Sequence, residues 1–174
     1  MTDSTLAAAV NAASRLTGSF KLRSGQISSE YFDKYRFEAD PKLLARVAAA
    51  MLPLVPADAE ILAGLELGGV PIATAMSLAS GRPAVFVRKQ AKEYGTCRAV
   101  EGADVRGRRV ALIEDVITTG GAVADAERLV REAGGEVVAV VCAIWRGAGP
   151  PRIEAAPHLP VIAAMTKQDL DAGG

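Results

Sequence analysis

One short segment constrains the fold more than any other part of the chain: Val110-Ala-Leu-Ile-Glu-Asp-Val-Ile-Thr-Thr-Gly-Gly-Ala122. Its apolar start, 110–113, is typical of a buried parallel strand, which we expect to end where Glu114 and Asp115 begin. From Val123 onward, apolar residues recur every three or four positions, which predicts a helix. A strand, a Gly-rich turn and a helix in this order form an anion site, because the turn N–H groups and the helix N-terminus converge.

The residue types in this turn indicate which ligand it would hold. Glycine lets the backbone wrap closely around a phosphate, and the hydroxyls of Thr118 and Thr119 can donate hydrogen bonds to it. Glu114 and Asp115 would repel a phosphate, so they would serve another part of the ligand, either adjacent sugar hydroxyls or a bound Mg²⁺. A ribose 5-phosphate fits all of these groups.

Other phosphate-binding motifs do not fit the sequence. A Walker A loop requires a lysine after its last glycine, whereas Gly121 is followed by Ala122. The dinucleotide fingerprint Gly-x-Gly-x-x-Gly does not occur in the chain. An ordinary strand-to-helix turn would explain 118–121 alone equally well, but the apolar run and the acidic pair before it favour a ribose-phosphate site.

Composition fits one α/β domain of 174 residues, half of them apolar. Twenty basic residues balance twenty acidic ones, which gives no reason to expect a nucleic-acid or membrane partner. The sequence lacks a signal-peptide pattern and a run long enough to cross a membrane, so we expect a cytoplasmic protein. Cys97 and Cys142 are far apart and His158 is the single histidine, which argues against a disulfide framework or a zinc site.

Apolar periodicity predicts the remaining elements. We expect helices over 5–16, 41–52 and 72–78 and one after Gly121, and strands over 60–65, 83–87, 110–113, 136–144 and 161–165, followed by a turn capped by Thr166. Aromatic residues and a Ser-Gly break in 20–37 predict two short strands joined by a turn. The later alternation of strands and helices predicts a parallel sheet.

Two more strands run into segments suited to anions. Glu66-Leu-Gly-Gly-Val70 precedes a helix; it is either an ordinary turn or, beside the first site, a place for a diphosphate. The segment 88–98 holds four cations, which by composition alone would indicate a solvated loop. Because it leaves a strand at the edge where α/β sheets bind ligands, we interpret it as a catalytic lid for a leaving diphosphate.

Three stretches, in this order, resemble a known enzyme family. They are Phe20-Lys-Leu-Arg-Ser-Gly25 continuing to Asp33, Arg88-Lys-Gln-Ala-Lys-Glu-Tyr-Gly95, and the segment 110–122. The last resembles the phosphoribosyl-diphosphate (PRPP) signature of type I phosphoribosyltransferases. Together the three resemble the orotate phosphoribosyltransferases over nearly the whole chain, since purine phosphoribosyltransferases share the signature but not the lysine loop.

The resemblance implies a type I phosphoribosyltransferase fold, an α/β fold with a five-stranded parallel sheet flanked by helices. It implies one domain over 1–174, with a small hood mainly at 18–38 and near 146–160. The expected reaction transfers a 5-phosphoribosyl group from PRPP to orotate, with Mg²⁺ as cofactor held mainly through PRPP rather than by protein ligands. A homodimer is implied, in which the lid of one subunit acts on the neighbouring site.

Carried over by position, the resemblance assigns roles to individual residues. Arg88, Lys89 and Lys92 would be the catalytic cations, with Lys92 the main one. The PRPP-binding residues would be Arg88, Lys89, Lys92, Tyr94, Glu114, Asp115, Val116, Ile117, Thr118, Thr119, Gly120, Gly121 and Ala122. Thr118 and Arg146 would bind orotate, where the planar guanidinium of Arg146 suits the carboxylate.

Two positions depart from the family pattern. Tyr94 stands where many relatives carry histidine, and its hydroxyl can still donate to a phosphate oxygen. Ile27 stands where some relatives carry lysine, so we expect Lys34 or Arg36 to supply part of the missing charge near orotate.

Three other functions are compatible with the signature segment. A phosphoribosyltransferase could act on a purine or on uracil, and a PRPP-sensing regulator could bind nucleic acid on the same fold. The balanced charge and the length of the chain argue against a regulator. A ribose-phosphate binding module without catalysis would need no cationic lid.

Replacing Lys92 by alanine should lower kcat much more than it raises the KM for orotate, because this cation would neutralise the diphosphate as it leaves. Steady-state kinetics with orotate varied at saturating PRPP measures both constants. An unchanged kcat would remove Lys92 from the mechanism.

Overall fold

A computed structural model describes residues 4–21, 24–90 and 98–172 of the chain. In chain order the elements are α1 (Ser4–Ser14), β1 (Arg15–Lys21), β2 (Ile27–Phe32), α2 (Tyr35–Ala39), α3 (Pro41–Met51), the 3₁₀ turn η1 (Leu52–Leu54), β3 (Ile61–Leu65), α4 (Gly69–Ser80), β4 (Ala84–Val87), β5 (Val100–Gly102), β6 (Arg109–Ile117), α5 (Gly121–Glu132), β7 (Glu136–Trp145), β8 (Val161–Thr166) and α6 (Lys167–Ala172). Within these ranges, no helix is both long and apolar enough to span a bilayer.

The central sheet has the strand order β5-β4-β3-β6-β7-β8. Every neighbouring pair from β4 to β8 is parallel, which confirms the predicted five-stranded parallel sheet. The edge strand β5 is antiparallel to β4 and was not predicted, because its three residues contain no apolar run. The carboxyl ends of the five parallel strands therefore all meet at one edge of the sheet.

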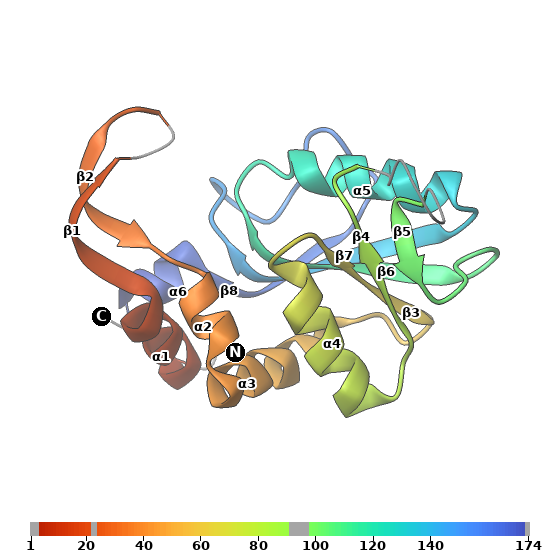
Figure 1. The fold of residues 1–174 in the computed structure, drawn as a ribbon, viewed down its shortest axis with the longest axis horizontal. Helices are drawn as coiled ribbons and strands as arrows, with labels where there is room; N and C mark the ends of the chain where they lie inside the picture. Colours follow the sequence, from red (N-terminus) through yellow and green to blue (C-terminus); the bar gives the residue numbers. More distant parts are fainter. Residues whose placement is uncertain (1–3, 22–23, 91–97, 173–174) are drawn as a thin grey trace.

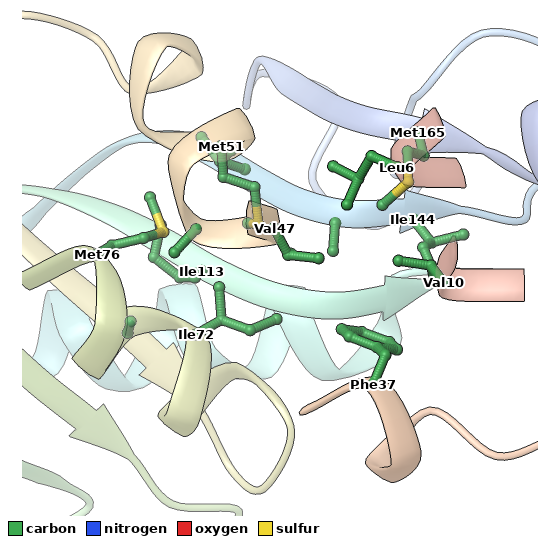
Figure 2. Packing of buried hydrophobic residues seen from close by; sticks show 14 of the residues in the cluster. Leu6, Val10, Phe37, Val47, Met51, Ile72, Met76, Ile113, Ile144 and Met165 are labelled. Carbon is green, nitrogen blue, oxygen red and sulfur yellow. The ribbon is translucent and has the colours of Figure 1, made fainter. Parts of the chain in front are cut away.

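Helices cover both faces of this sheet, with α5 on one face and α3 and α4 on the other (Figure 1). On the second face, buried side chains of α1, α2, α3 and α4, among them Val10, Phe37, Met51 and Ile72, pack against β6 and β7, where Ile113 of β6 is buried (Figure 2). A separate cluster fills the α5 face, and the segment between β7 and β8 contributes Ile153, Ala156 and Leu159 to it. Burying each large aliphatic side chain contributes roughly 1.5–3 kcal/mol to folding.

The strands β1 and β2 form a two-stranded antiparallel hairpin that projects away from the main sheet (Figure 1). Two strands joined by a turn were expected in 20–37; the hairpin is present, but β1 begins earlier, at Arg15, and residues 35–39 form the helix α2 instead of strand. The rings of Phe20 and Tyr31 lie 5.6 Å apart across the pair. The helix expected over 5–16 ends at Ser14 instead, because Leu16 pairs with Tyr31 of β2. The division of the chain into a core and a hood stays a prediction.

Two predicted N-terminal caps are confirmed by the structure. Asp40 Oδ1 accepts hydrogen bonds from the backbone N–H groups of Lys42 and Leu43, at 2.9 and 3.0 Å, and Pro41 follows as the first helical residue. At the other end of the chain, Thr166 Oγ1 accepts a hydrogen bond from the backbone N–H of Asp169, which confirms the predicted cap.

Two further expectations were wrong in their boundaries. Strand β6 does not end at residue 113, because β7 continues beside it and pairs Glu114 with Cys142 and Val116 with Ile144. The acidic pair therefore lies inside the strand. Helix α4 begins at Gly69 rather than near residue 72, so the glycines of the second turn belong to the helix start.

Candidate active site

The predicted site segments meet at the carboxyl edge of the sheet. Glu66 follows β3, Arg88 follows β4, Thr118 follows β6 and Arg146 follows β7. Since these strands are parallel, all four connections leave the same edge, which is where open α/β sheets bind ligands.

The turn between β6 and α5 has the shape of an anion site. Gly120 has φ of 80°, and a Cβ at this position would lie 2.5 Å from the buried side chain of Ile153. Its carbonyl accepts hydrogen bonds from the N–H groups of Val123 and Ala124, each at 3.1 Å, so the helix begins here. The remaining positions, Thr118, Thr119, Gly121 and Ala122, are exposed. The first N–H groups of α5 and the two hydroxyls can thus reach a bound anion.

Two predicted PRPP contacts, Val116 and Ile117, have side chains that pack into the protein. Ile117 is 2% exposed in the α5-side cluster, and Val116 packs against the opposite cluster. Their roles as ligand contacts stay predictions, and such contacts would come from the backbone.

Glu114 and Asp115 are buried, 8% and 0% exposed, just before this turn. Glu114 Oε1 accepts a hydrogen bond from the Asp115 N–H at 3.1 Å, and Asp115 Oδ1 accepts one from Val116 N–H. Burial, and then the charge of Asp115, raise the pKa of Glu114 to about 9. The two carboxyl groups therefore differ in charge, with Glu114 the neutral member at pH 7.

Asp115 keeps its charge because Lys34 lies against it. Burial acts to raise the pKa of Asp115, but Lys34, together with the neighbouring Glu114 and Glu38 side chains, outweighs burial, and the pKa is lowered. Lys34 Nζ lies 2.6 Å from Asp115 Oδ2. Burial acts to lower the pKa of Lys34, and its contact with Asp115 raises it overall. Lys34 therefore lies next to Asp115, the carboxylate that is predicted to bind the ribose, whereas Arg36 is exposed on α2. The expected role of Lys34 or Arg36 near orotate stays a prediction.

Sequence reasoning missed Glu38, which is 7% exposed and faces the same carboxylate. Burial, followed by a hydrogen bond to Asp115, raises the pKa of Glu38 to about 9. At neutral pH Glu38 is therefore an uncharged acid close to Asp115. No local pattern marked it, because a single glutamate in a short segment is usually a surface residue.

The second Gly-rich turn packs tightly over these carboxyl groups. A Cβ at Gly68 would lie 1.6 Å from Asp115 Oδ2, and one at Gly69 would lie 2.2 Å from the carbonyl oxygen of Ile113. The Glu66–Leu67 peptide bond is cis. Only glycine lets the start of α4 approach β6 this closely.

The start of the predicted lid lies beside this turn. The Lys89 N–H donates to Glu66 Oε2 at 3.1 Å, and the Arg88 N–H donates to the Ala99 carbonyl at 2.8 Å. Arg88, Lys89 and Ala122 line one cavity of about 260 Å³. The structure thus brings together two predicted lid cations and the end of the signature turn. Lys92, Tyr94 and Cys97 lie outside the described residues.

Arg146 is fixed next to the signature turn. Its N–H donates to the carbonyl of Ile117 at 2.8 Å, and a Cβ on Gly147 would lie 2.8 Å from the carbonyl oxygen of Thr118. The guanidinium lies 5.4 Å from the centre of the Phe32 ring, which joins the hairpin to the sheet edge. Arg146 and Phe32 also line a cavity of about 490 Å³.

Comparison with known proteins agrees with this arrangement. A family model described as phosphoribosyl transferase domain matches residues 36–158. A curated orotate phosphoribosyltransferase from Nocardioides sp. is 61% identical over 170 residues, covering 98% of this chain and 95% of the relative.

Solved structures give the same result. The orotate phosphoribosyltransferase of Mycobacterium tuberculosis in complex with Fe(III) dicitrate has a TM-score of 0.84 and 36% identity, covering 96% of this chain and 97% of that one. The complex of the M. tuberculosis enzyme with PRPP has a TM-score of 0.79 and 31% identity, covering 97% and 98%.

These matches show that the fold is that of a phosphoribosyltransferase, as the resemblance indicated. Within this class the chain belongs to the orotate phosphoribosyltransferase family, since the relatives that share nearly its whole length carry that name.

The raised pKa of Glu38 predicts a pH dependence of stability. The folded chain keeps the Glu38 proton up to about pH 9, whereas the unfolded chain releases it near the ordinary value of 4.5, so this group's contribution to stability is lost as pH rises between these values. Glu38→Gln removes the titration. We expect the melting temperature of the wild type to fall more from pH 5 to pH 9 than that of Glu38→Gln, measured by calorimetry in matched buffers. Parallel curves would contradict the assigned protonation.

Proposed function

We propose that the chain transfers the 5-phosphoribosyl group of PRPP to orotate, giving orotidine 5′-phosphate and diphosphate, a step of pyrimidine nucleotide synthesis. The observation that carries the proposal is the position of the buried Glu114–Asp115 pair directly before the open N-terminus of α5. A sugar phosphate needs carboxyl groups for its hydroxyls and N–H donors for its phosphate, and these must lie side by side. The identity of 61% with an orotate phosphoribosyltransferase over almost the whole chain supports the choice of reaction.

The signature turn would hold the ribose 5-phosphate. The 5-phosphate would accept hydrogen bonds from the first N–H groups of α5 and from the exposed hydroxyls of Thr118 and Thr119. The ribose hydroxyls would donate to Asp115, the charged member of the pair, and Glu114 would act as a neutral acid that can both donate and accept.

The diphosphate would lie between the two other connections. The N-terminus of α4 at Gly69 offers N–H groups, and Arg88 and Lys89 offer positive charge at the end of β4. We assign Lys92 and Tyr94 to the same leaving group, on the sequence pattern alone. Cations at the departing oxygens stabilise charge that develops only in the transition state, so they would raise kcat.

Orotate would lie near Arg146 and Thr118. The Arg146 guanidinium, supported by the Phe32 ring, presents two parallel N–H donors to the orotate carboxylate. A ring nitrogen of orotate then bonds to the anomeric carbon while the bond from that carbon to the diphosphate oxygen breaks. Positive charge builds on the ribose ring during this step. Orotate is already an anion, so no strong protein base is needed.

Mg²⁺ would enter as part of the substrate, bound to the diphosphate of PRPP. Among the described residues no group of three or more His, Cys, Asp or Glu side chains could hold a metal ion, and Asp115 is already paired with Lys34. Mg²⁺ commonly binds through substrate phosphates with one or two protein carboxylates, which fits this donor set. When bound, it would neutralise charge on the leaving diphosphate.

The reaction is tested by mixing the protein with Mg²⁺, PRPP and orotate and following the loss of orotate's ultraviolet absorbance. Uracil, which lacks the carboxylate, is the matched control and should react far more slowly, because Arg146 would then be left unpaired. Turnover of a purine or of uracil, with none of orotate, would overturn the assignment. Fractionation of the source cells should place the activity in the cytoplasm.

We also propose a homodimer whose lids act on the neighbouring site, and mixing two inactive variants tests it. In hybrids of Lys92→Ala and Asp115→Asn, the intact lid of one subunit would serve the intact ribose site of the other. Activity should therefore reappear after the two variants are unfolded and refolded together, and not when they are refolded separately. A mixture that stays inactive, although sedimentation shows hybrid dimers, would mean that each lid serves its own site.

A further inference from the structure

The short helix α2 brings two ionisable side chains to Asp115. Lys34 directly precedes the helix and Glu38 lies within it, four positions later, so both lie on the same side of one helical turn. Asp115 comes from β6, in the middle of the sheet. Lys34 Nζ lies 2.6 Å from Asp115 Oδ2; the Lys34 side chain is 34% exposed and that of Asp115 is fully buried.

Glu38 and Asp115 each place one buried carboxyl oxygen in this group. Among the described residues, no N–H or hydroxyl group donates to Glu38 Oε1, nor to Asp115 Oδ2 apart from its ion pair with Lys34. Leaving buried carboxyl oxygens without partners is unfavourable. A proton on Glu38 donated to Asp115 satisfies both oxygens at once, and leaves one negative charge facing one positive charge.

The backbone at the start of α4 holds this group together. A Cβ on Gly68 would lie 1.6 Å from Asp115 Oδ2 and 3.0 Å from Glu38 Oε1, so both oxygens lie close to the same point. The carboxyl groups of Asp115 and Glu38 thus occupy the space that a side chain at position 68 would fill. Three segments that are distant in sequence therefore meet at Asp115: α2, the turn before α4, and β6.

We propose that Lys34 and Glu38 are positioning residues for ribose recognition, which hold the Asp115 carboxylate charged and in one orientation toward the ribose hydroxyls of PRPP. The inference rests on the proposed function, because that function assigns the ribose to Asp115. The Val116 N–H holds Oδ1 and Lys34 holds Oδ2, with Glu38 Oε1 nearby, so the carboxylate is restrained from rotating. Such restraint from surrounding groups is what a binding site needs in order to be preorganised.

A merely structural role for Lys34 and Glu38 predicts different behaviour. If they only tied α2 to the sheet, their loss would lower stability without a specific effect on PRPP, and the loss would not depend on the charge of Asp115. A positioning role acts through that charge. The two roles therefore separate when PRPP binding is measured with and without the Asp115 carboxylate.

The experiment measures binding of Mg²⁺–PRPP by calorimetry, without orotate. Lys34→Met and Glu38→Met should each weaken binding by about tenfold or more, whereas Glu38→Gln, whose amide can still donate to Asp115, should retain most of the affinity. Lys42→Met, which removes a lysine exposed on α3, is the matched control and should bind as the wild type does. Thermal unfolding confirms that each variant is folded; if Glu38→Met is not, Glu38→Asp, with its shorter acid, replaces it.

The same substitutions are then made in Asp115→Asn. There Lys34→Met and Glu38→Met should change PRPP affinity by less than about twofold, because their partner charge is gone. A loss of PRPP affinity in the Asp115→Asn protein as large as in the wild type would overturn the inference. Wild-type PRPP affinity of the Lys34→Met and Glu38→Met single variants would also overturn it. Failure of the orotate assay with these binding results intact would instead refute only the proposed base.

Discussion

The parallel pairing of β6 with β3 on one side and β7 on the other is the constraint on which the site depends. It buries the centre of the strand between two apolar clusters and sets the carboxyl ends of its neighbours at the same edge. Each connection from that edge then contributes one kind of group: carboxyls within β6, N–H groups at α4 and α5, cations after β4 and a guanidinium after β7. A change in register would separate these groups, because side chains alternate between the two faces of a strand.

Burying acidic groups in such a strand opposes folding. Moving a charged carboxylate out of water costs several kcal/mol unless a partner compensates. Here a single lysine compensates Asp115, and raised pKa values keep Glu38 and Glu114 neutral, so the group carries one negative charge instead of three. A folded chain that keeps this arrangement gives up some stability to hold a charged carboxylate in a fixed position.

Glycine is needed at this edge because backbone segments approach the reactive groups closely. Gly68 leaves space for the Asp115 carboxylate, and Gly120 leaves space for Ile153 while adopting a positive φ. Both helices then begin close to β6, α4 beside Ile113 and α5 shortly after the strand ends. Positive charge from fixed backbone groups complements the side-chain cations after β4, and together they suit a ligand with several phosphates.

The sequence by itself determined the parts that depend on neighbouring residues. The strand–turn–helix unit around Thr118–Ala122, the cap at Asp40 and the succession of parallel strands follow from local patterns, and so does the family. The tertiary structure alone decided the antiparallel edge strand β5, the continuation of β6 through Glu114 and Asp115, and the helical form of α2. It also decided the group of Lys34, Glu38 and Asp115. These features arise from pairing and burial between segments far apart in the chain, and no local pattern records which distant residue will supply the missing hydrogen bond or charge.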